Sequence, residues 1–358
     1  MNLFFRDNHS ADSISTEPAS AGISIEIAAL LKLNYPSLFQ SEASFNTEII
    51  GGANINSLNY RINKNYYLKF LPVQKAGLKP EVYPQLADQL RHTGFNSADF
   101  YSTEGEEEKK FGLIVNSDFL KGEHYFFLQD FISESFYTGT EEQAMQVPEL
   151  VLKLENVFSK SSGWTDSSIF QESSPFRNIN LKADWEKLKP LLEERGAAND
   201  PFLTQTISII PELISGYLEF NADELDNLIE FPDFGVYHSD LHPHNLLSDS
   251  SNNLWVIDHE SFRFMPKVIY RGFSIFKLLR KSISTERCTL HFIQELIRER
   301  FRKDEILKLK FGAQTELVRR ILLILNLHYF SGDSRWNADL VKHTAGVKEA
   351  ELMFSQAE

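Results

Sequence analysis

Two segments, VYHSDLHPHNLL at residues 236–247 and WVIDHE at residues 255–260, carry the strongest signal in this chain of 358 residues. The first holds Asp240 and Asn245 five positions apart, with Pro243 between them. Proline fixes φ and has no backbone N–H, so this segment cannot be a regular helix or a central strand. An aspartate and an asparagine held in such a loop predict a polar functional site.

Asp258 in the second segment follows the apolar run 254–257, which is typical of a short buried strand. A carboxylate at the end of such a strand meets little competing water. Together with the Asn245 amide it offers the hard oxygen ligands that Mg²⁺ prefers. Asp240 is then left to accept a proton from a hydroxyl. Phosphoryl transfer needs one carboxylate that orients the nucleophile, and an amide and a second carboxylate that bind the metal.

The spacing H-x-D-x-x-x-x-N, with a second aspartate 18 positions after the first, resembles the aminoglycoside phosphotransferase and choline kinase family of small-molecule kinases. Family members read H-G-D-x-H-x-x-N-x-L and then I-D-[WF]-[ED]; Ser239 stands here in place of the glycine. The resemblance covers roughly residues 45–279 in the same order. It implies an α+β, protein-kinase-like fold, with a small β-rich N-lobe, a larger α-helical C-lobe and ATP in the cleft between them.

The resemblance also implies a role for each polar residue of the two segments. Asp240 would be the catalytic aspartate, and Asn245 and Asp258 would be the Mg²⁺ ligands. Glu260 would help at a second metal or support the loop, and His238 would hold the loop in place. The substrate would be a small molecule with a hydroxyl group: an amino sugar, a sugar, a choline-like molecule or a hydroxy amino acid.

The N-terminal half resembles the nucleotide-binding half of the same family. GGANIN at 51–56 is typical of a hairpin tip, because glycine and asparagine tolerate positive φ, and it is similar to the hairpin over the ATP phosphates. Three further features resemble the family's nucleotide site. The lysine in YLKF resembles the phosphate-binding lysine, and a glutamate at the start of the next helix resembles the partner of that lysine. The segment LQDFI at 128–132 resembles the adenine-binding segment. The residues assigned to the nucleotide are Gly51, Gly52, Asn54, Lys69, Glu81, Gln129 and Phe131.

The pattern of apolar residues predicts a β-rich part followed by a helical part. Strands are expected over 45–50, 58–62, 66–71, 99–102, 111–115 and 125–132. Helices are expected over 23–33, 80–92, 148–160, 181–195, 203–220, 273–283, 290–302, 306–329 and 339–354, with a loop region over 231–257. This gives a loose arm at 1–22, an N-lobe with the nucleotide-binding sheet and helix at 23–132, and a helical C-lobe with the catalytic loop and substrate site at 133–358.

Composition narrows the partners and the compartment. The net charge of −14 argues against a nucleic-acid partner, although residues 271–310 hold eleven Lys or Arg against five Asp or Glu. A basic run of this kind is typical of a solvated helical face. The single cysteine, Cys288, allows no intramolecular disulfide, and no segment has the length and apolarity of a membrane helix or a signal peptide. We therefore expect no membrane partner and a cytoplasmic protein; the sequence indicates no oligomeric state.

Two other classes of protein fit parts of the pattern. A catalytically silent kinase fold that only binds ligands would share the architecture, but the complete set of Lys69, Asp240, Asn245 and Asp258 argues against it. A metal-dependent hydrolase could use His242, His244 and His259, but three convergent ligands are needed and Pro243 interrupts their alternation.

Overall fold

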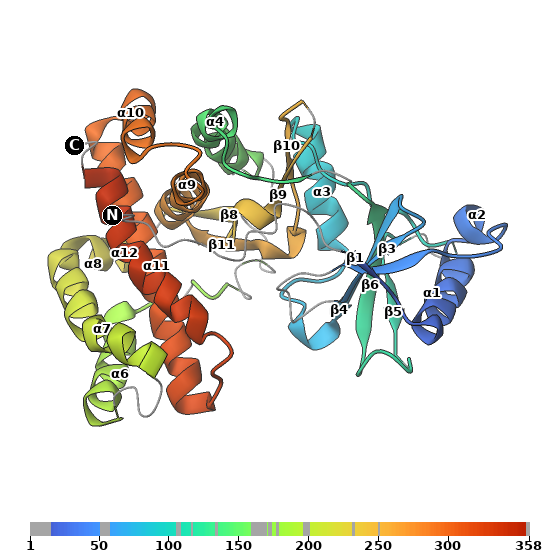
Figure 1. Cartoon of the computed structure of the whole chain (residues 1–358), viewed down its shortest axis with the longest axis horizontal. Coiled ribbons are helices and arrows are strands. Elements are labelled where there is room, and N and C mark those ends of the chain that lie inside the picture. The colour runs from blue at the N-terminus through green and yellow to red at the C-terminus, as the bar shows by residue number, and fades with distance from the viewer. Residues whose placement is uncertain are drawn as a thin grey trace. The chain divides into compact units, whose positions relative to one another are not determined.

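The computed structural model describes residues 16–50, 58–104, 109–115, 117–132, 135–158, 170, 174–176, 179–195, 201–230, 233–249 and 251–355. They form two compact units (Figure 1). The N-terminal unit comprises the described residues within His9–Tyr137 and within His244–Ser261. The helical unit comprises those within Thr138–Pro243 and within Phe262–Glu358.

A six-stranded antiparallel sheet is the framework of the N-terminal unit. Its strands are β1 (Thr16–Pro18), β2 (Thr47–Ile50), β3 (Leu58–Ile62), β4 (Tyr66–Pro72), β5 (Gly112–Ile114) and β6 (His124–Asp130), in the order β1-β2-β3-β4-β6-β5. Strand β4 is central, and Lys69 lies opposite Asn59 on β3 and Phe127 on β6. Since side chains alternate along a strand, Lys69 and its neighbour Phe70 face opposite sides of the sheet.

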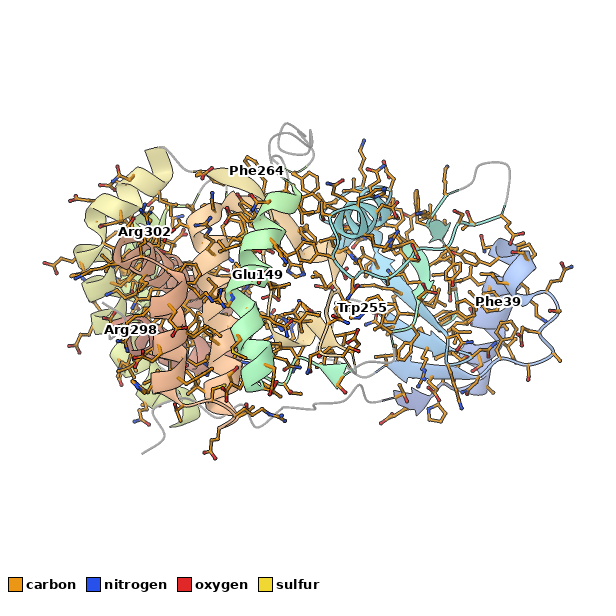
Figure 2. The ribbon with its side chains drawn as sticks, turned by 90° about the horizontal axis from the view of Figure 1, so that it is seen from above. Phe39, Glu149, Trp255, Phe264, Arg298 and Arg302 are labelled. Atoms are coloured by element: carbon orange, nitrogen blue, oxygen red, sulfur yellow. The ribbon has the colours of Figure 1, made fainter. Side chains whose placement is uncertain are left out.

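The two faces of this sheet are covered by different helices. One face carries an apolar core that includes Phe70 and Leu128, packed against α1 (Ala21–Asn34) and α2 (Pro36–Phe39). Phe39 in α2, labelled in Figure 2, contributes to this core. On the other face, Phe127 packs against Tyr83 of α3 (Val82–His92), with ring centroids 5.7 Å apart. Lys69 therefore lies on the α3 face.

A small second sheet in the N-terminal unit carries one of the two polar segments. It consists of β7 (Ser135–Phe136), β9 (Leu246–Ser248) and β10 (Leu254–Val256), in the order β10-β9-β7. Trp255 on β10, labelled in Figure 2, forms a bridge with Asn96, just after α3. This sheet joins residues 244–261 to the N-terminal unit.

Eight helices and a two-stranded sheet form the described part of the helical unit. They are α4 (Glu141–Val157), α6 (Leu181–Arg195), α7 (Pro201–Phe220), α8 (Ala222–Glu230), α9 (Lys267–Ser284), α10 (Leu290–Arg300), α11 (Lys303–Ser331) and α12 (Asn337–Ser355), with β8 (Phe234–His238) paired to β11 (Phe262–Pro266). Helices α9 and α11 pack closely because Gly272 and Gly312 lie at their contact. A Cβ on Gly272 would meet the backbone of Leu309, and one on Gly312 would meet that of Val268. No helix in the described ranges is long and apolar enough to cross a membrane.

Most predicted elements are present, and the differences have local causes. Strand β3 and helix α6 have the predicted bounds. Helix α4 begins at Glu141 rather than at Pro148, because Thr140 and Gln143 form a reciprocal capping box that starts it earlier. The predicted strand over 99–102 is reduced to a single bridge between Phe100 and Gln129.

Two segments expected to be irregular contain ordered elements. Residues 16–18 of the expected loose arm pair with β2, because Glu17 lies in register with Ile49 at the sheet edge. The expected loop over 231–257 contains β8, β9 and β10, and α8 precedes it. The first two of these strands are short and almost wholly buried, so they lack the polar and apolar alternation that marks a half-exposed strand. Residues 244–261 group with the N-terminal unit, whereas we expected the whole of 133–358 in one lobe.

Candidate active site

Asp258 is held in a strained turn directly after β10. Its φ is +64°, a conformation that aspartate tolerates better than most residues and that is uncommon outside glycine. The Asp258 carbonyl accepts a hydrogen bond from Ser261 N (2.9 Å), and its Oδ2 accepts one from Ser261 Oγ. Ile257 N donates to the Asn245 carbonyl (3.2 Å), so the backbone of Asn245 lies beside the residue that precedes Asp258. Strained backbone held by such contacts is typical of functional sites.

Lys69, Asp258 and Glu260 form a cluster that we call the lysine–carboxylate cluster. Lys69 Nζ lies 3.3 Å from Asp258 Oδ1 and also contacts Glu260 Oε1. The lysine side chain is 8% exposed, and burial lowers its pKa while the charge and hydrogen bond of Asp258 oppose that change. Two carboxylates beside one buried lysine favour its charged form and oppose the effect of burial.

The donor atoms of this region fit a magnesium ion. Asp258 and Glu260 supply carboxylate oxygens and Asn245, which is 9% exposed, supplies an amide. These are hard oxygen donors of the kind that Mg²⁺ prefers. In the described residues, no group of three or more His, Cys, Asp or Glu side chains is arranged to hold a metal. A magnesium site here would depend on the amide and on phosphate oxygens of a ligand, as Mg²⁺ sites of nucleotide enzymes do.

The histidines near these segments have packing and hydrogen-bonding partners. His259 is 3% exposed, its Nε2 lies 2.7 Å from Ser97 Oγ, and its ring packs against Phe100. The His244 ring lies 5.3 Å from that of Phe136. His259 therefore fixes the turn after Asp258 against the segment that follows α3. The metal-dependent hydrolase has no support in these contacts.

Asp240, in the helical unit, contacts the side chains of an arginine and a histidine. Arg320 Nη2 lies 2.9 Å from Asp240 Oδ1, and His242 Nε2 lies 3.4 Å from Oδ2. The Asp240 backbone N donates to His238 Nδ1 (3.4 Å), and His238 is itself buried against Phe262. Burial would raise the pKa of Asp240, but Arg320, His242 and Lys277 outweigh it and hold that pKa well below its usual range.

Arg320 on α11 is the residue at this site that sequence reasoning missed. It is positioned by Glu316, whose side chain is fully buried: Arg320 Nε lies 2.8 Å and Arg319 Nε 2.7 Å from the two Glu316 oxygens. Asp240 and Arg320 are 80 positions apart. In the sequence, ELVRR at 316–320 is typical of ion pairs on an exposed helix face, so it gave no signal of a contact with Asp240.

The expected pair between Glu81 and Lys69 is not formed. Glu81 occupies the N-cap position of α3 without a side-chain capping hydrogen bond and is exposed, whereas Lys69 is buried. The apolar residues of α3 occupy the face toward the sheet, so Lys69 pairs with Glu260 and Asp258 instead. The described residues thus give Lys69 other partners, and the role assigned to Glu81 stays a prediction.

The other residues assigned to the nucleotide have varied positions. Gln129 is buried on β6, opposite Tyr67. Phe131 N donates to the Asn65 carbonyl (2.7 Å), and the Arg61 guanidinium lies over the Phe131 ring at 4.3 Å. The Phe131 amide is thus already used within the chain, so it is not available to an adenine base in this structure. Gly51, Gly52 and Asn54 lie outside the described residues.

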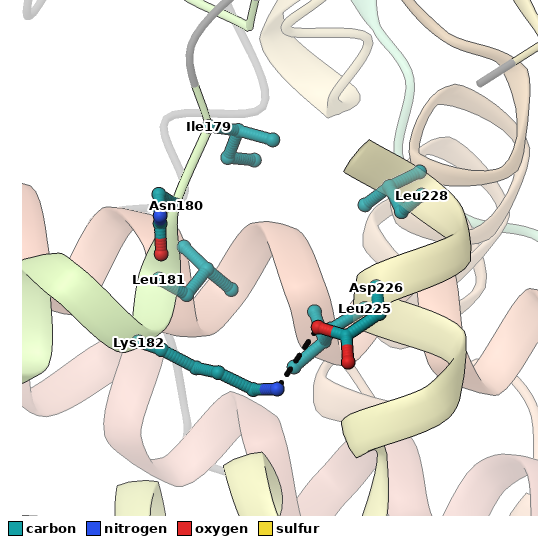
Figure 3. A pocket seen from close by; sticks show the side chains of 7 residues that line it. All are labelled: Ile179, Asn180, Leu181, Lys182, Leu225, Asp226 and Leu228. Carbon is teal, nitrogen blue, oxygen red and sulfur yellow. Dashed lines mark hydrogen bonds and ion pairs between the residues drawn. The ribbon is translucent and has the colours of Figure 1, made fainter. Parts of the chain in front are cut away.

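A small pocket also lies in the helical unit, between the start of α6 with the two residues before it and helix α8 (Figure 3). An ion pair between Lys182 and Asp226 (2.9 Å) crosses it. The pocket is lined by Ile179, Asn180, Leu181, Lys182, Leu225, Asp226 and Leu228. None of these residues belongs to the predicted site.

Comparison with solved structures identifies the fold. A spectinomycin phosphotransferase with ADP and spectinomycin matches with a TM-score of 0.56 and 17% identity, over 95% of this chain and 99% of that one. An aminoglycoside 2′-phosphotransferase with GDP matches with a TM-score of 0.54 and 14% identity, over 94% and 99%. A choline/ethanolamine kinase family protein from Mesorhizobium loti matches with a TM-score of 0.50 and 14% identity, over 94% and 99%.

These likenesses confirm the predicted α+β, protein-kinase-like fold. They also confirm, at the level of the fold, the predicted resemblance to aminoglycoside phosphotransferases and choline kinases. No protein-family model and no curated protein matches the chain in sequence.

Proposed function

We propose that this chain is a phosphotransferase that moves the γ-phosphate of ATP to a hydroxyl group of a small molecule. The observation that carries the proposal is the lysine–carboxylate cluster beside Asn245. A buried lysine, two carboxylates and an amide supply what a magnesium nucleotide needs: a cation for the phosphates and oxygen ligands for the metal. The fold shared with phosphotransferases that were solved with ADP or GDP supports the choice of a nucleotide.

Each member of the set has a distinct role in the proposed reaction. Asn245 and Asp258 would hold Mg²⁺, with Glu260 at a second metal, and Lys69 would donate to phosphate oxygens. Bound magnesium would neutralise charge on the transferred phosphoryl group. The strained turn at Asp258 and the His259–Ser97 contact keep these oxygens in place before the nucleotide arrives. Such positioning, rather than covalent chemistry by the protein, supplies most of the catalysis of phosphoryl transfer.

Asp240 would orient the acceptor and receive its proton. The acceptor oxygen forms a bond to the γ-phosphorus, the bond from that phosphorus to the bridging oxygen of ADP breaks, and the hydroxyl proton passes to Asp240. Because Arg320 holds the pKa of Asp240 low, this carboxylate is a weak base. A weak base suits a loose transition state in which the attacking hydroxyl keeps its proton until late. Only four residues separate Asp240 from Asn245 in the sequence.

Thermal unfolding with nucleotides tests the proposal. A ligand at 100 times its dissociation constant adds about 2.7 kcal/mol to the free energy of unfolding. We expect such a rise with Mg·ATP or Mg·GTP in the wild type and none in Asp258→Ala. No rise with either nucleotide would overturn the proposal. Binding without transfer to any hydroxyl acceptor would instead identify a catalytically silent kinase fold.

A further inference from the structure

Lys277 on α9 is a partly buried lysine without a carboxylate partner. Among the described residues, no Asp or Glu oxygen forms an ion pair or hydrogen bond with it. Its Nζ lies 5.5 Å from the centre of the Phe273 ring, and the Arg320 guanidinium lies 4.5 Å from the centre of the same ring. Two cations thus share one aromatic ring beside Asp240. A partly buried cation without a counter-ion is unfavourable, and proteins seldom keep one without a reason.

Other cations surround Lys277 on three helices. Lys277, Arg280, Arg320 and Lys342 form what we call the cationic cluster, on α9, α11 and α12. Burial and the charges of the other three lower the pKa of Lys277 to about 7, against an opposing contribution from Asp240. Burial, together with Lys277, Arg320 and Lys342, also holds the pKa of His343 on α12 well below its usual range. His343 is 6% exposed, and its Nδ1 has no hydrogen-bond partner in the described part of the chain.

The carboxylates of this region are already engaged by other cations. Asp240 is bound by Arg320, and Glu316 is shared by Arg319 and Arg320. Glu349, which is 2% exposed, is paired with Arg280. No carboxylate among them is left to pair with Lys277, so this part of the helical unit has an excess of positive charge next to the proposed catalytic aspartate.

The excess of positive charge beside Asp240 determines which acceptors can bind there. A cationic amine would be repelled at close range by the cationic cluster, whereas a carboxylate or phosphate group would gain an ion pair with Lys277. The region remains accessible, since the Asp240 side chain is 34% exposed and that of Arg320 is 21% exposed. An anionic group on Lys277 would leave the rest of a small ligand near Asp240, because Lys277 and Arg320 pack on the same Phe273 ring and Arg320 binds Asp240.

We propose that the acceptor of the phosphate is an anionic hydroxy compound, whose carboxylate or phosphate group binds Lys277 while its hydroxyl meets Asp240. This inference rests on the proposed phosphotransfer function and specifies its substrate class. It differs from the substrate printed for one of the matching structures, spectinomycin. Among the substrate classes considered above, it excludes molecules whose only charge is positive, such as choline-like molecules.

Anion binding without nucleotide is the first test. Calorimetric titrations at constant ionic strength would use sodium phosphate, sodium acetate and, as the cationic probe, tetramethylammonium chloride. We expect binding of phosphate or acetate, and the anion that binds more tightly distinguishes a phosphate-bearing from a carboxylate-bearing acceptor. Lys277→Met should weaken that binding by about 10- to 100-fold, the usual effect of losing a charge-assisted hydrogen bond. Lys277→Arg should retain most of it.

Two matched variants separate this site from others. Lys348 is an exposed lysine on α12, and Lys348→Met should leave anion binding unchanged. Lys69→Met should leave the anion binding that depends on Lys277 unchanged, and any binding that it removes belongs to the proposed nucleotide site. Anion binding that is absent, that survives Lys277→Met, or that is weaker than binding of tetramethylammonium would overturn the inference. Anion binding lost only in Lys69→Met would assign the anion to the nucleotide phosphate site and overturn it as well.

Transfer assays then connect the site to the reaction. With Mg·ATP, we expect glycerate or glycerol 3-phosphate to be a better acceptor than choline, and Lys277→Met to raise KM more than it lowers kcat. Transfer to choline in preference to both anions would overturn the inference. Normal Mg·ATP binding without anion binding would refute the inference alone. Anion binding without Mg·ATP binding would refute the proposed function.

Discussion

Lys69 and Lys277 are both withdrawn from solvent, yet their surroundings have opposite charge. Lys69 contacts Asp258 and Glu260, so its charge is balanced within the chain. The charged groups that act on Lys277 in the described residues are three cations and Asp240, which is already paired with Arg320. The comparison separates two kinds of ligand: the first region supplies oxygen ligands for a metal, and the second is complementary to an anion. The predictions below change the charge in each region and ask whether the two respond differently.

The largest effect is expected at Asp240. Asp240→Asn keeps the shape of the side chain but removes the proton acceptor, so transfer should fall by about 10²- to 10⁴-fold. Mg·ATP binding should stay within about threefold of the wild type, because nucleotide binding is assigned to the other region. Steady-state kinetics and calorimetry measure the two quantities. Equal loss of both would show that Asp240 acts in nucleotide binding and that the two regions are not distinct.

Lys69→Met should be next in size and should also destabilise the fold. Removing one partner of a buried ion pair leaves two carboxylates facing each other and costs about 3 kcal/mol. Urea unfolding measures this loss, and nucleotide binding should weaken as well. The double variant Lys69→Met with Glu260→Gln should recover part of the stability, because one of the repelling charges is gone. An unchanged free energy of unfolding in Lys69→Met would contradict the proposed charge balance.

Arg320→Gln should shift the acid limb of the rate profile. Arg320 holds the pKa of Asp240 well below its usual range, so the carboxylate stays ionised in the wild type as the pH falls. Without Arg320 the pKa of Asp240 rises, and activity should disappear at a higher pH. Arg319→Gln is the matched control, since Arg319 pairs with the same Glu316 but not with Asp240. The same acid limb in both variants would argue against the Arg320–Asp240 pair.

The smallest expected effect concerns Lys277 and pH-dependent stability. Its pKa of about 7 lies below the usual lysine value, so unfolding takes up a proton between those two pH values. Stability should therefore rise with pH from about 7 toward about 10.4, the lysine value in unfolded chains. The charged groups that act on Lys277 are Arg280 on its own helix, Arg320 on α11, Lys342 on α12 and Asp240. Lys277 in turn acts on the titratable side chain of His343 on α12.

Replacing Lys277 should reduce this rise. Urea unfolding at several pH values should give a flatter profile for Lys277→Met than for the wild type, while Lys348→Met should retain the wild-type slope. A slope that is the same in all three proteins would show that Lys277 keeps an ordinary pKa, and the charge difference between the two regions would then be smaller than described here.

The sequence predicted the lysine–carboxylate cluster in part, because its members lie in local patterns. Asp258 follows a buried strand and Asn245 precedes one, and the strand of Lys69 follows a glycine-rich hairpin sequence. The partner of Lys69 was not predicted. Glu81 lies at a helix start in the sequence, but the register of α3 turns it to solvent and leaves the pairing to Glu260.

The cationic cluster could not be predicted, because it depends on contacts between distant helices. Residues 271–310 were interpreted as a solvated basic face, yet Arg280 and Lys281 are buried. The close packing of α9 on α11 at Gly272 and Gly312 brings the basic side chains of these helices together. No spacing in a single helix encodes that arrangement. Arg320 belongs to the same case, since its contact with Asp240 spans 80 positions.

Calorimetric titration of Mg·ATP into the wild type, Asp258→Ala and Asp240→Asn tests the central claim most directly. The claim is that Lys69, Asp258 and Glu260 with Asn245 form a nucleotide site. It predicts binding in the wild type, binding in Asp240→Asn and its loss in Asp258→Ala. A wild type that does not bind Mg·ATP, or an Asp258→Ala variant that binds it as tightly as the wild type, would contradict the claim.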